Sequence, residues 1–167
     1  PSRVVDTADR PVAGIGISAT PVWSDRLGRT TSGEDRIVTE PGAKTDENGY
    51  AELPHVTEWR RVRSRVSAQP DALDLVLVMP QQPLKRERVY FEDFPTETVV
   101  IRVPSHGSLE FVMKDARTGD PIGDGTGVFL SPDETDTTAY WDGEILGEGR
   151  SLFPFVATGG RFYARDY

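Results

Sequence analysis

Apolar and polar residues alternate along several short segments of the chain, with the period of two that marks a strand with one solvated face. In "RRVRSRVSA" (60–68) valines alternate with arginines, and "ETVVIRVP" (97–104) shows the same alternation. In "SLEFVMKD" (108–115) one side is formed by Leu109, Phe111 and Met113. Each of these segments is therefore predicted to be a strand.

Two further segments favour the same secondary structure. "LDLVLVMP" (73–80) is apolar at nearly every position, as a central strand covered on both faces would be. "TDENGYAEL" (45–53) is a turn followed by a strand, with an Asn-Gly pair suited to positive φ. The 16 Gly and 13 Pro interrupt the chain too often for long helices. Short strands separated by turns at intervals of about 8–12 residues predict an all-β chain of sandwich type.

The chain also repeats itself. "GYAELPHV" (49–56) and "GRSLFPFV" (149–156) both read Gly, three residues, a bulky apolar residue, Pro, one residue, Val. "DTADRPVAG" (6–14) matches "DARTGDPIGDG" (115–125) in an Asp, a polar turn, and Pro followed by Val or Ile. Two copies of one fold are the simplest interpretation.

The match continues on both sides of the shared phrase. "GIGISATP" (14–21) matches "GTGVFLSP" (125–132), and "RVRSRV" (61–66) aligns with "RFYARD" (161–166). The two copies are offset by 111 residues at Gly14/Gly125 but by 100 residues at Gly49/Gly149, in the shared phrase. The first copy therefore carries an 11-residue insertion, which a surface loop tolerates at little cost.

The boundary between the copies is predicted near "VPSHGS". We expect a first module over residues 1–104 that folds independently, a short linker from Pro104 to Gly107, and a second module over 105–167. The second module has no counterpart of residues 67–103, which supply about three strands in the first. It is therefore predicted to be incomplete, and the chain to be a segment of a longer modular protein.

Composition narrows the function classes. A net charge of −8 and a pI near 4.8 argue against nucleic acid as a partner. The absence of Cys excludes disulfides, Cys-ligated zinc and thiol catalysis. No window approaches the roughly 20 apolar residues of a membrane-spanning helix, so no membrane insertion of this segment is expected.

The order of these motifs resembles the carboxypeptidase regulatory-like family, whose sequences typically read "G-x-V-x-D-x-x-G-x-P-[VL]-x-G-A-x-V" and then "T-D-x-x-G-x-[FY]". The matching residues of the first module are Asp6, Pro11, Val12, Gly14, Ile17, Thr45, Asp46, Gly49 and Tyr50. Those of the second are Gly107, Asp115, Gly119, Pro121, Ile122, Gly125 and Val128. Arg10 replaces the usual Gly, and "DGEILGEGRSLF" (142–153) replaces a clean "T-D-x-x-G". The resemblance covers essentially all of the first module and the first half of the fold in the second.

The resemblance implies tandem Ig-like or prealbumin-like β-sandwiches, of the transthyretin-like or Cna-B-like type. It further implies a non-catalytic role as a spacer, an accessory domain or an adhesive unit. The residues agree, because the two histidines, His55 and His106, are isolated in a predicted turn and the linker. No pair among the 27 Asp and Glu is singled out as acid and base, so no enzyme and no cofactor is predicted.

Two features could still bind a ligand. "SPDETDTT" (131–138) and "TDENG" (45–49) concentrate oxygen ligands and could hold calcium, although solvated loops are the favoured interpretation. Aromatic faces can also stack on sugars, with core packing as the favoured alternative. The candidates for such a platform are Trp23, Trp59, Tyr140 and Trp141.

The sequence therefore predicts a structural or accessory segment of an exported bacterial protein, extracellular or in the cell envelope. Its expected partners are other domains of the parent protein, together with a polysaccharide or a cell-surface protein. A carbohydrate-binding module beside an exported enzyme is the alternative. The two differ in that a binding module should expose two or more aromatic side chains on one patch.

Overall fold

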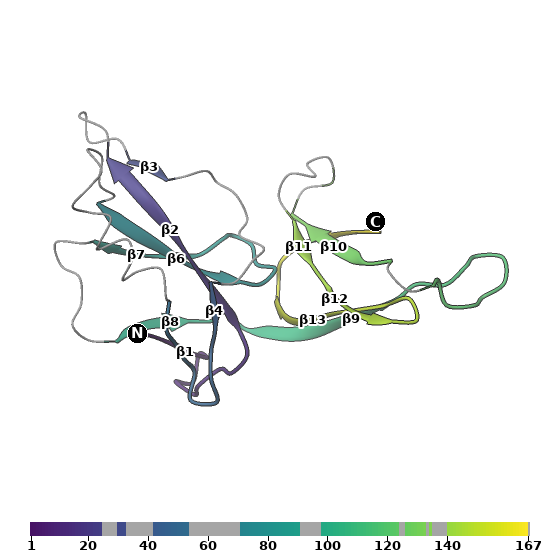
Figure 1. Cartoon of the computed structure of the whole chain (residues 1–167), viewed down its shortest axis with the longest axis horizontal. Helices are drawn as coiled ribbons and strands as arrows, with labels where there is room; N and C mark the ends of the chain where they lie inside the picture. Colours follow the sequence, from purple (N-terminus) through teal and green to yellow (C-terminus); the bar gives the residue numbers. More distant parts are fainter. Residues whose placement is uncertain are drawn as a thin grey trace. The chain divides into compact units, whose positions relative to one another are not determined.

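Every regular element that the computed structural model describes is a strand, which confirms the predicted all-β class (Figure 1). The structure describes residues 1–24, 30–32, 42–53, 71–90, 98–123, 126–132, 134 and 140–166. The chain forms two compact units. Unit 1 comprises Pro1–Val78 and Leu84–Pro104, and unit 2 comprises Met79–Pro83 and Ser105–Tyr167.

Unit 1 contains two sheets. The larger has the order β3-β2-β6-β7, with β4 also pairing β2, and the smaller has the order β5-β1-β8. In the smaller sheet β1 runs antiparallel to β5 and parallel to β8. The strands of the larger sheet are β2 (Gly16–Ser24), β3 (Thr30–Ser32), β4 (Ala43–Lys44), β6 (Ala72–Val78) and β7 (Arg86–Tyr90). Those of the smaller sheet are β1 (Ser2–Val5), β5 (Tyr50–Ala51) and β8 (Val99–Arg102).

Both sheets of unit 1 contribute to its core, as in a sandwich. Strand β6 lies between β2 and β7 and is buried along almost its whole length, as its continuous apolar sequence predicts. In β8 the predicted alternation is confirmed, because Ile101 is buried and Val100 is exposed. Burying a side chain of this size contributes about 1.5–3 kcal/mol. The predicted strand "RRVRSRVSA" (60–68) lies outside the described residues.

Unit 2 has two three-stranded sheets, with the orders β11-β10-β14 and β12-β13-β9. Buried Leu130 and Trp141 come from the first sheet, and buried Phe153 comes from the second. The strands are β9 (His106–Val112), β10 (Val128–Ser131), β11 (Trp141–Asp142), β12 (Glu144–Gly147), β13 (Arg150–Ala157) and β14 (Tyr163–Asp166). Because β9 already begins at His106, the predicted linker from Pro104 to Gly107 is wrong in extent.

A short segment from the middle of the first module also belongs to unit 2. The Ala157 N–H donates to the carbonyl of Pro80 at 2.8 Å, and the Gln82 side-chain amide donates to the carbonyl of Pro132 at 3.0 Å. Met79 and Gln81 are both buried. The local pattern of residues 79–83 gives no indication of this, since the partners are about 50 or more residues away in sequence.

The repeat is visible in the backbone hydrogen bonds of the two units. The Val4 N–H donates to Gly49 O, and the Met113 N–H donates to Gly149 O, both at 2.8 Å. The next turn repeats as well, with Val12 N–H to Val4 O and Ile122 N–H to Met113 O both at 3.1 Å. Likewise Gly42 donates to Ile17 O at 2.9 Å, and Gly143 to Val128 O at 3.0 Å. The sequence repeat is therefore accompanied by equivalent contacts in the two units.

The last strand of unit 2 takes a position that the sequence alignment does not predict. Strand β14 pairs antiparallel with β10, on the side opposite β11. In unit 1 the equivalent strand β2 has β6 as its antiparallel neighbour. In unit 2, β14 thus occupies the position that β6, from "LDLVLVMP" (73–80), occupies in unit 1. The sequence of β14 nevertheless aligns with residues 61–66. A counterpart of "LDLVLVMP" was expected to be missing, and that expectation is wrong.

Gly49 and Gly149 place the backbone of the shared phrase directly against the first strand of each unit. Both have positive φ, 77° and 69°, as the Asn-Gly pair predicts for Gly49. A Cβ on Gly49 would lie 2.4 Å from Val4 O, and one on Gly149 would lie 2.6 Å from Met113 O. Each of the two positions therefore requires glycine for two reasons: its positive φ, and the carbonyl oxygen that a Cβ would meet.

Gly49→Ala and Gly149→Ala are expected to destabilise the chain more than the matched controls Gly14→Ala and Gly119→Ala. All four positions have φ between 69° and 77°, so each alanine costs about 1–2 kcal/mol in the left-handed region. The control positions have open space around the added Cβ, whereas the other two meet a carbonyl oxygen. Urea unfolding of the four variants measures the difference. Equal losses at all four positions would show that the close approach is unimportant.

Candidate functional site

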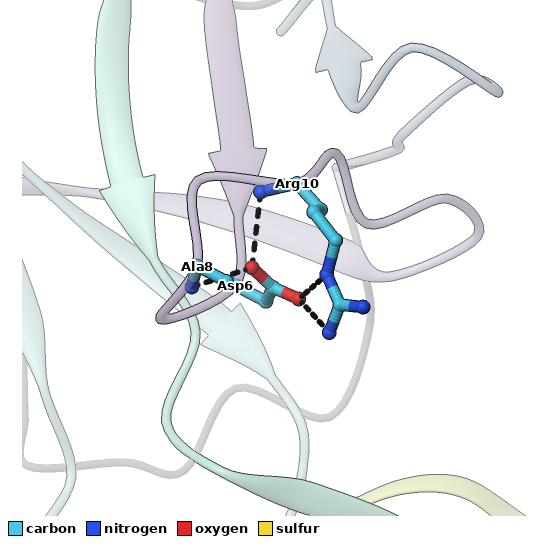
Figure 2. A network of polar contacts seen from close by, with 3 residues as sticks. All are labelled: Asp6, Ala8 and Arg10. Atoms are coloured by element: carbon cyan, nitrogen blue, oxygen red, sulfur yellow. Dashed lines mark hydrogen bonds and ion pairs between the residues drawn. The ribbon is translucent and has the colours of Figure 1, made fainter.

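The carboxylate of Asp6 organises the turn that follows β1 (Figure 2). Its Oδ1 accepts the N–H groups of Ala8 at 2.7 Å and Arg10 at 3.0 Å, and its Oδ2 accepts the Arg10 Nε at 2.7 Å. The main-chain N–H of Arg10 is the largest cause that lowers the pKa of Asp6. This acid is a turn-forming residue whose oxygens are already engaged.

The same function recurs at two other acids. Asp115, the counterpart of Asp6 in unit 2, accepts the N–H groups of Arg117 and Thr118, both at 2.8 Å. These bonds, that of Thr118 first, lower the pKa of Asp115. Asp46 accepts the N–H groups of Asn48 at 2.9 Å and Tyr50 at 2.8 Å. All three acids therefore stabilise turns.

The described residues of the two acidic loops do not form a set of calcium ligands. In "TDENG" (45–49) the Asp46 Oδ1 is occupied by main-chain donors. Most of "SPDETDTT" (131–138) lies outside the described residues. In the part of the chain that the structure describes, no three His, Asp or Glu side chains gather as a metal site would require.

A buried ion pair lies within the apolar strand β6. Asp74 is 1% exposed, and its two oxygens accept Arg88 Nε at 2.7 Å and Nη2 at 2.9 Å. Arg86 approaches the same carboxylate at 3.8 Å. The hydrogen bond to Asp74 is the main cause that raises the pKa of Arg88. The sequence feature that indicates this ion pair is a lone Asp in "LDLVLV" together with two arginines in "KRERVY". It is not among the predictions made from the sequence.

Between the two sheets of unit 1 an open hollow of about 520 Å³ is lined by both. Its apolar lining is formed by Leu75, Leu77, Val100 and Ile101, and its charged lining by Lys85, Arg86, Glu87 and Arg102. Both arginines of this lining have acidic neighbours, since Arg102 pairs with Asp9 at 2.5 Å and Arg86 lies near Asp74. The two arginines at the hollow thus belong to ion pairs of the fold.

The structure describes the side chains of two of the four residues of the predicted aromatic platform, Tyr140 and Trp141. Trp141 is 3% exposed and packs edge-on against Phe162 at a centroid distance of 5.9 Å. Tyr140 is 36% exposed, with its ring 5.2 Å from that of Phe129. Trp59 and the side chain of Trp23 lie outside the described residues. Trp141 is therefore a core residue, and Tyr140 remains as an exposed candidate.

The structure describes one of the two histidines, His106. His106 lies in β9 rather than in a linker, with its ring 5.5 Å from Phe155. His55 lies outside the described residues.

Comparison with known proteins adds little. No family model matches the chain, and no curated protein matches it significantly. A streptococcal ancillary pilin of known structure is similar over 98% of this chain, with 16% identity and a TM-score of 0.33, and the chain spans 51% of that protein. Values this low establish neither family nor function, so the resemblance to the carboxypeptidase regulatory-like family stays a prediction. Among the described residues, no helix has the length and apolar character needed to cross a membrane.

Asp6→Asn is expected to make the free energy of unfolding fall less steeply as the pH is lowered. Because the pKa of Asp6 is lowered on folding, its carboxylate stabilises the fold above the unfolded pKa of about 3.9. That contribution disappears as the pH falls through the lower folded value. Asn keeps an oxygen for the two N–H groups but does not titrate. Urea midpoints of unit 1 measured from pH 5 to about pH 2 test this.

Arg10→Ala is the companion variant for that experiment. It removes the guanidinium but keeps the main-chain N–H of residue 10, which is the largest cause of the lowered pKa. In Arg10→Ala the free energy of unfolding should therefore keep most of its dependence on pH in acid. An unchanged slope in Asp6→Asn would contradict the interpretation.

Arg88→Met is expected to lower the free energy of unfolding by about 2 kcal/mol, because it leaves a buried carboxylate without its bidentate partner. The loss should be smaller than for a fully buried pair, since the Arg88 side chain is 30% exposed and Arg86 is near. The double variant Asp74→Leu/Arg88→Met should recover much of the stability, as no charge is then buried. A double variant no more stable than Arg88→Met in urea unfolding would argue against this.

Proposed function

We propose that the chain is a non-catalytic structural segment, built from two related β units in tandem, of a larger exported bacterial protein. The observation that carries this proposal is the nature of the repeat. The residues that recur between units make turns and strand pairs, as at Gly49 and Gly149 and at Asp6 and Asp115. Duplication has thus retained the framework of the unit, which is what a spacer or adhesive segment needs.

The ion pairs of unit 1 support the same proposal. Asp74 binds Arg88, and Asp9 binds Arg102, so these charges link neighbouring parts of the unit. A location outside the cell or in its envelope, and association with other domains of the parent protein, follow from the sequence resemblance. They belong to the proposal on that basis.

A carbohydrate-binding module is the second candidate, and Tyr140 is the observation in its favour. Its ring is partly exposed beside Phe129, as a sugar-stacking residue would be. The neighbouring Trp141 cannot add a second face, because it is buried against Phe162. The structural role is therefore the better supported.

Affinity electrophoresis through gels containing starch, xylan or a β-glucan should separate the two functions. A structural segment is expected to migrate at the same rate with and without polysaccharide. Tyr140→Ala should migrate as the unmodified chain does, and Tyr90→Ala provides a control at an exposed tyrosine of unit 1. Retardation that is lost in Tyr140→Ala and kept in Tyr90→Ala would overturn the structural proposal in favour of carbohydrate binding.

A further inference from the structure

Asn48 lies in the exposed turn between β4 and β5, and it is the chain's one asparagine. It is followed by Gly49, which carries no side chain. An asparagine can lose ammonia when the main-chain nitrogen of the next residue attacks its side-chain carbonyl carbon, Cγ. A side chain on that next residue hinders the attack, and glycine removes this hindrance. Asn48 is therefore a candidate for a covalent modification that needs no enzyme.

The modification has two steps, and water is its one co-reactant. In the first step the Gly49 nitrogen gives its proton to solvent and forms a bond to Asn48 Cγ. The bond from Cγ to the amide nitrogen breaks, and ammonia leaves with the bonding electrons and a proton from solvent, so that a five-membered succinimide remains. In the second step water opens this ring. Opening at Cγ gives aspartate, whereas opening at the main-chain carbonyl gives isoaspartate, in which the main chain runs through the side-chain carbon.

The turn holds the attacking nitrogen in a hydrogen bond. The Gly49 N–H donates to Asp46 O at 3.0 Å. The electron pair left by its deprotonation would therefore point at Asp46 O and not at Asn48 Cγ. The carboxylate of Asp46 accepts the N–H groups on either side, those of Asn48 at 2.9 Å and Tyr50 at 2.8 Å. A negative charge on the Gly49 nitrogen would thus lie close to a carboxylate, which makes deprotonation unfavourable while the turn is closed.

Contacts outside the turn restrain the same peptide unit. The Gly49 carbonyl accepts the Val4 N–H at 2.8 Å, and a Cβ on Gly49 would lie 2.4 Å from Val4 O. The Asp46 N–H donates to Tyr50 O at 2.8 Å, which closes the two ends of the turn. To bond Asn48 Cγ, the Gly49 nitrogen must give up its hydrogen bond and rotate its peptide plane. The contacts with β1 resist that rotation, so ring closure requires local opening.

The two products differ in how they fit this site. Aspartate leaves the main chain unchanged at position 48. Isoaspartate lengthens the main chain by one carbon atom directly before Gly49, whose carbonyl is bonded to Val4 and whose Cα lies against Val4 O. The longer chain displaces Gly49 from this contact.

We propose that Asn48 is a site of spontaneous deamidation, which the turn organised by Asp46 keeps unreactive and which reacts when that turn opens. The isoaspartate product does not fit against β1, so its formation prevents the turn from closing again. This inference goes beyond the proposed function and does not depend on it. It rests on the described residues of unit 1 alone.

The first test compares the full chain with a synthetic peptide of residues 43–53, "AKTDENGYAEL", which has blocked ends. Both are aged at mildly alkaline pH. Deamidation adds about 1 Da, and fragmentation by electron transfer distinguishes isoaspartate from aspartate. The chain should react at least about tenfold more slowly than the peptide, which corresponds to a local opening free energy of about 1.4 kcal/mol. Equal rates would overturn the proposal, and so would a peptide that stays unmodified.

Asp46→Ala removes the acceptor of two N–H groups and should bring the rate in the chain towards that of the peptide. Asp6→Ala is the matched control, because Asp6 accepts two N–H groups in another turn of unit 1. An equal acceleration in both variants would show that general loss of stability controls the reaction, against the proposal. Asn48→Gln should stay unmodified, since its longer side chain closes the five-membered ring no longer.

The chain unfolded in urea should deamidate at the rate of the peptide, which tests the protection by the turn even if Asp46→Ala does not fold. A rate that stays slow in urea would overturn the proposal.

The isoaspartate form, purified from aged chain, tests the effect on the fold. It should unfold at a lower urea concentration than the variant Asn48→Asp, which has the same charge and an unaltered main chain. Its amide signal of Val4 should shift in NMR spectra, because the hydrogen bond to Gly49 O is lost. Equal urea midpoints and an unshifted Val4 signal would show that the longer main chain is accommodated, contrary to the proposal.

Discussion

The close approach of a turn glycine to the first strand is the constraint on which both units depend. Gly49 lies so near Val4 O that no other residue fits, and Gly149 stands in the same relation to Met113 O. The contact connects the shared phrase to the start of each unit. It lies next to the pairing of β5 with β1 and of β13 with β9.

Around this contact, charged residues serve the backbone. Asp6, Asp46 and Asp115 each accept two main-chain N–H groups and so stabilise exposed turns. Asp74 is a different case, because it is buried in a central strand and requires Arg88. These four acids therefore serve the fold itself.

The two units differ chiefly in what closes their sheets. In unit 1 β6 lies beside β2 and β8 lies beside β1, whereas in unit 2 β14 takes the place of β6 and no strand among the described residues takes the place of β8. Residues 79–83, with buried Met79 and Gln81, belong to unit 2 although they lie within the sequence of the first module. A repeat in sequence therefore does not require each unit to be built from the same consecutive segments.

The sequence by itself determined what depends on near neighbours. The period-two alternation in 97–104, the continuous apolar run in 73–80 and the positive φ at Gly49 all follow from a few adjacent residues, and the structure confirms them. The all-β class and the repeat were predictable for the same reason. Strand periodicity and turn chemistry are local properties.

Only the tertiary structure decided which segments pair. The parallel alignment of β8 with β1, the place of β14 beside β10 and the bond from Ala157 to Pro80 each join residues far apart in sequence. The same holds for the burial of Trp141 against Phe162 and for the ion pair of Asp74 with Arg88. Several partners of suitable pattern exist for each strand, and the choice among them follows from packing in three dimensions, which no local pattern encodes.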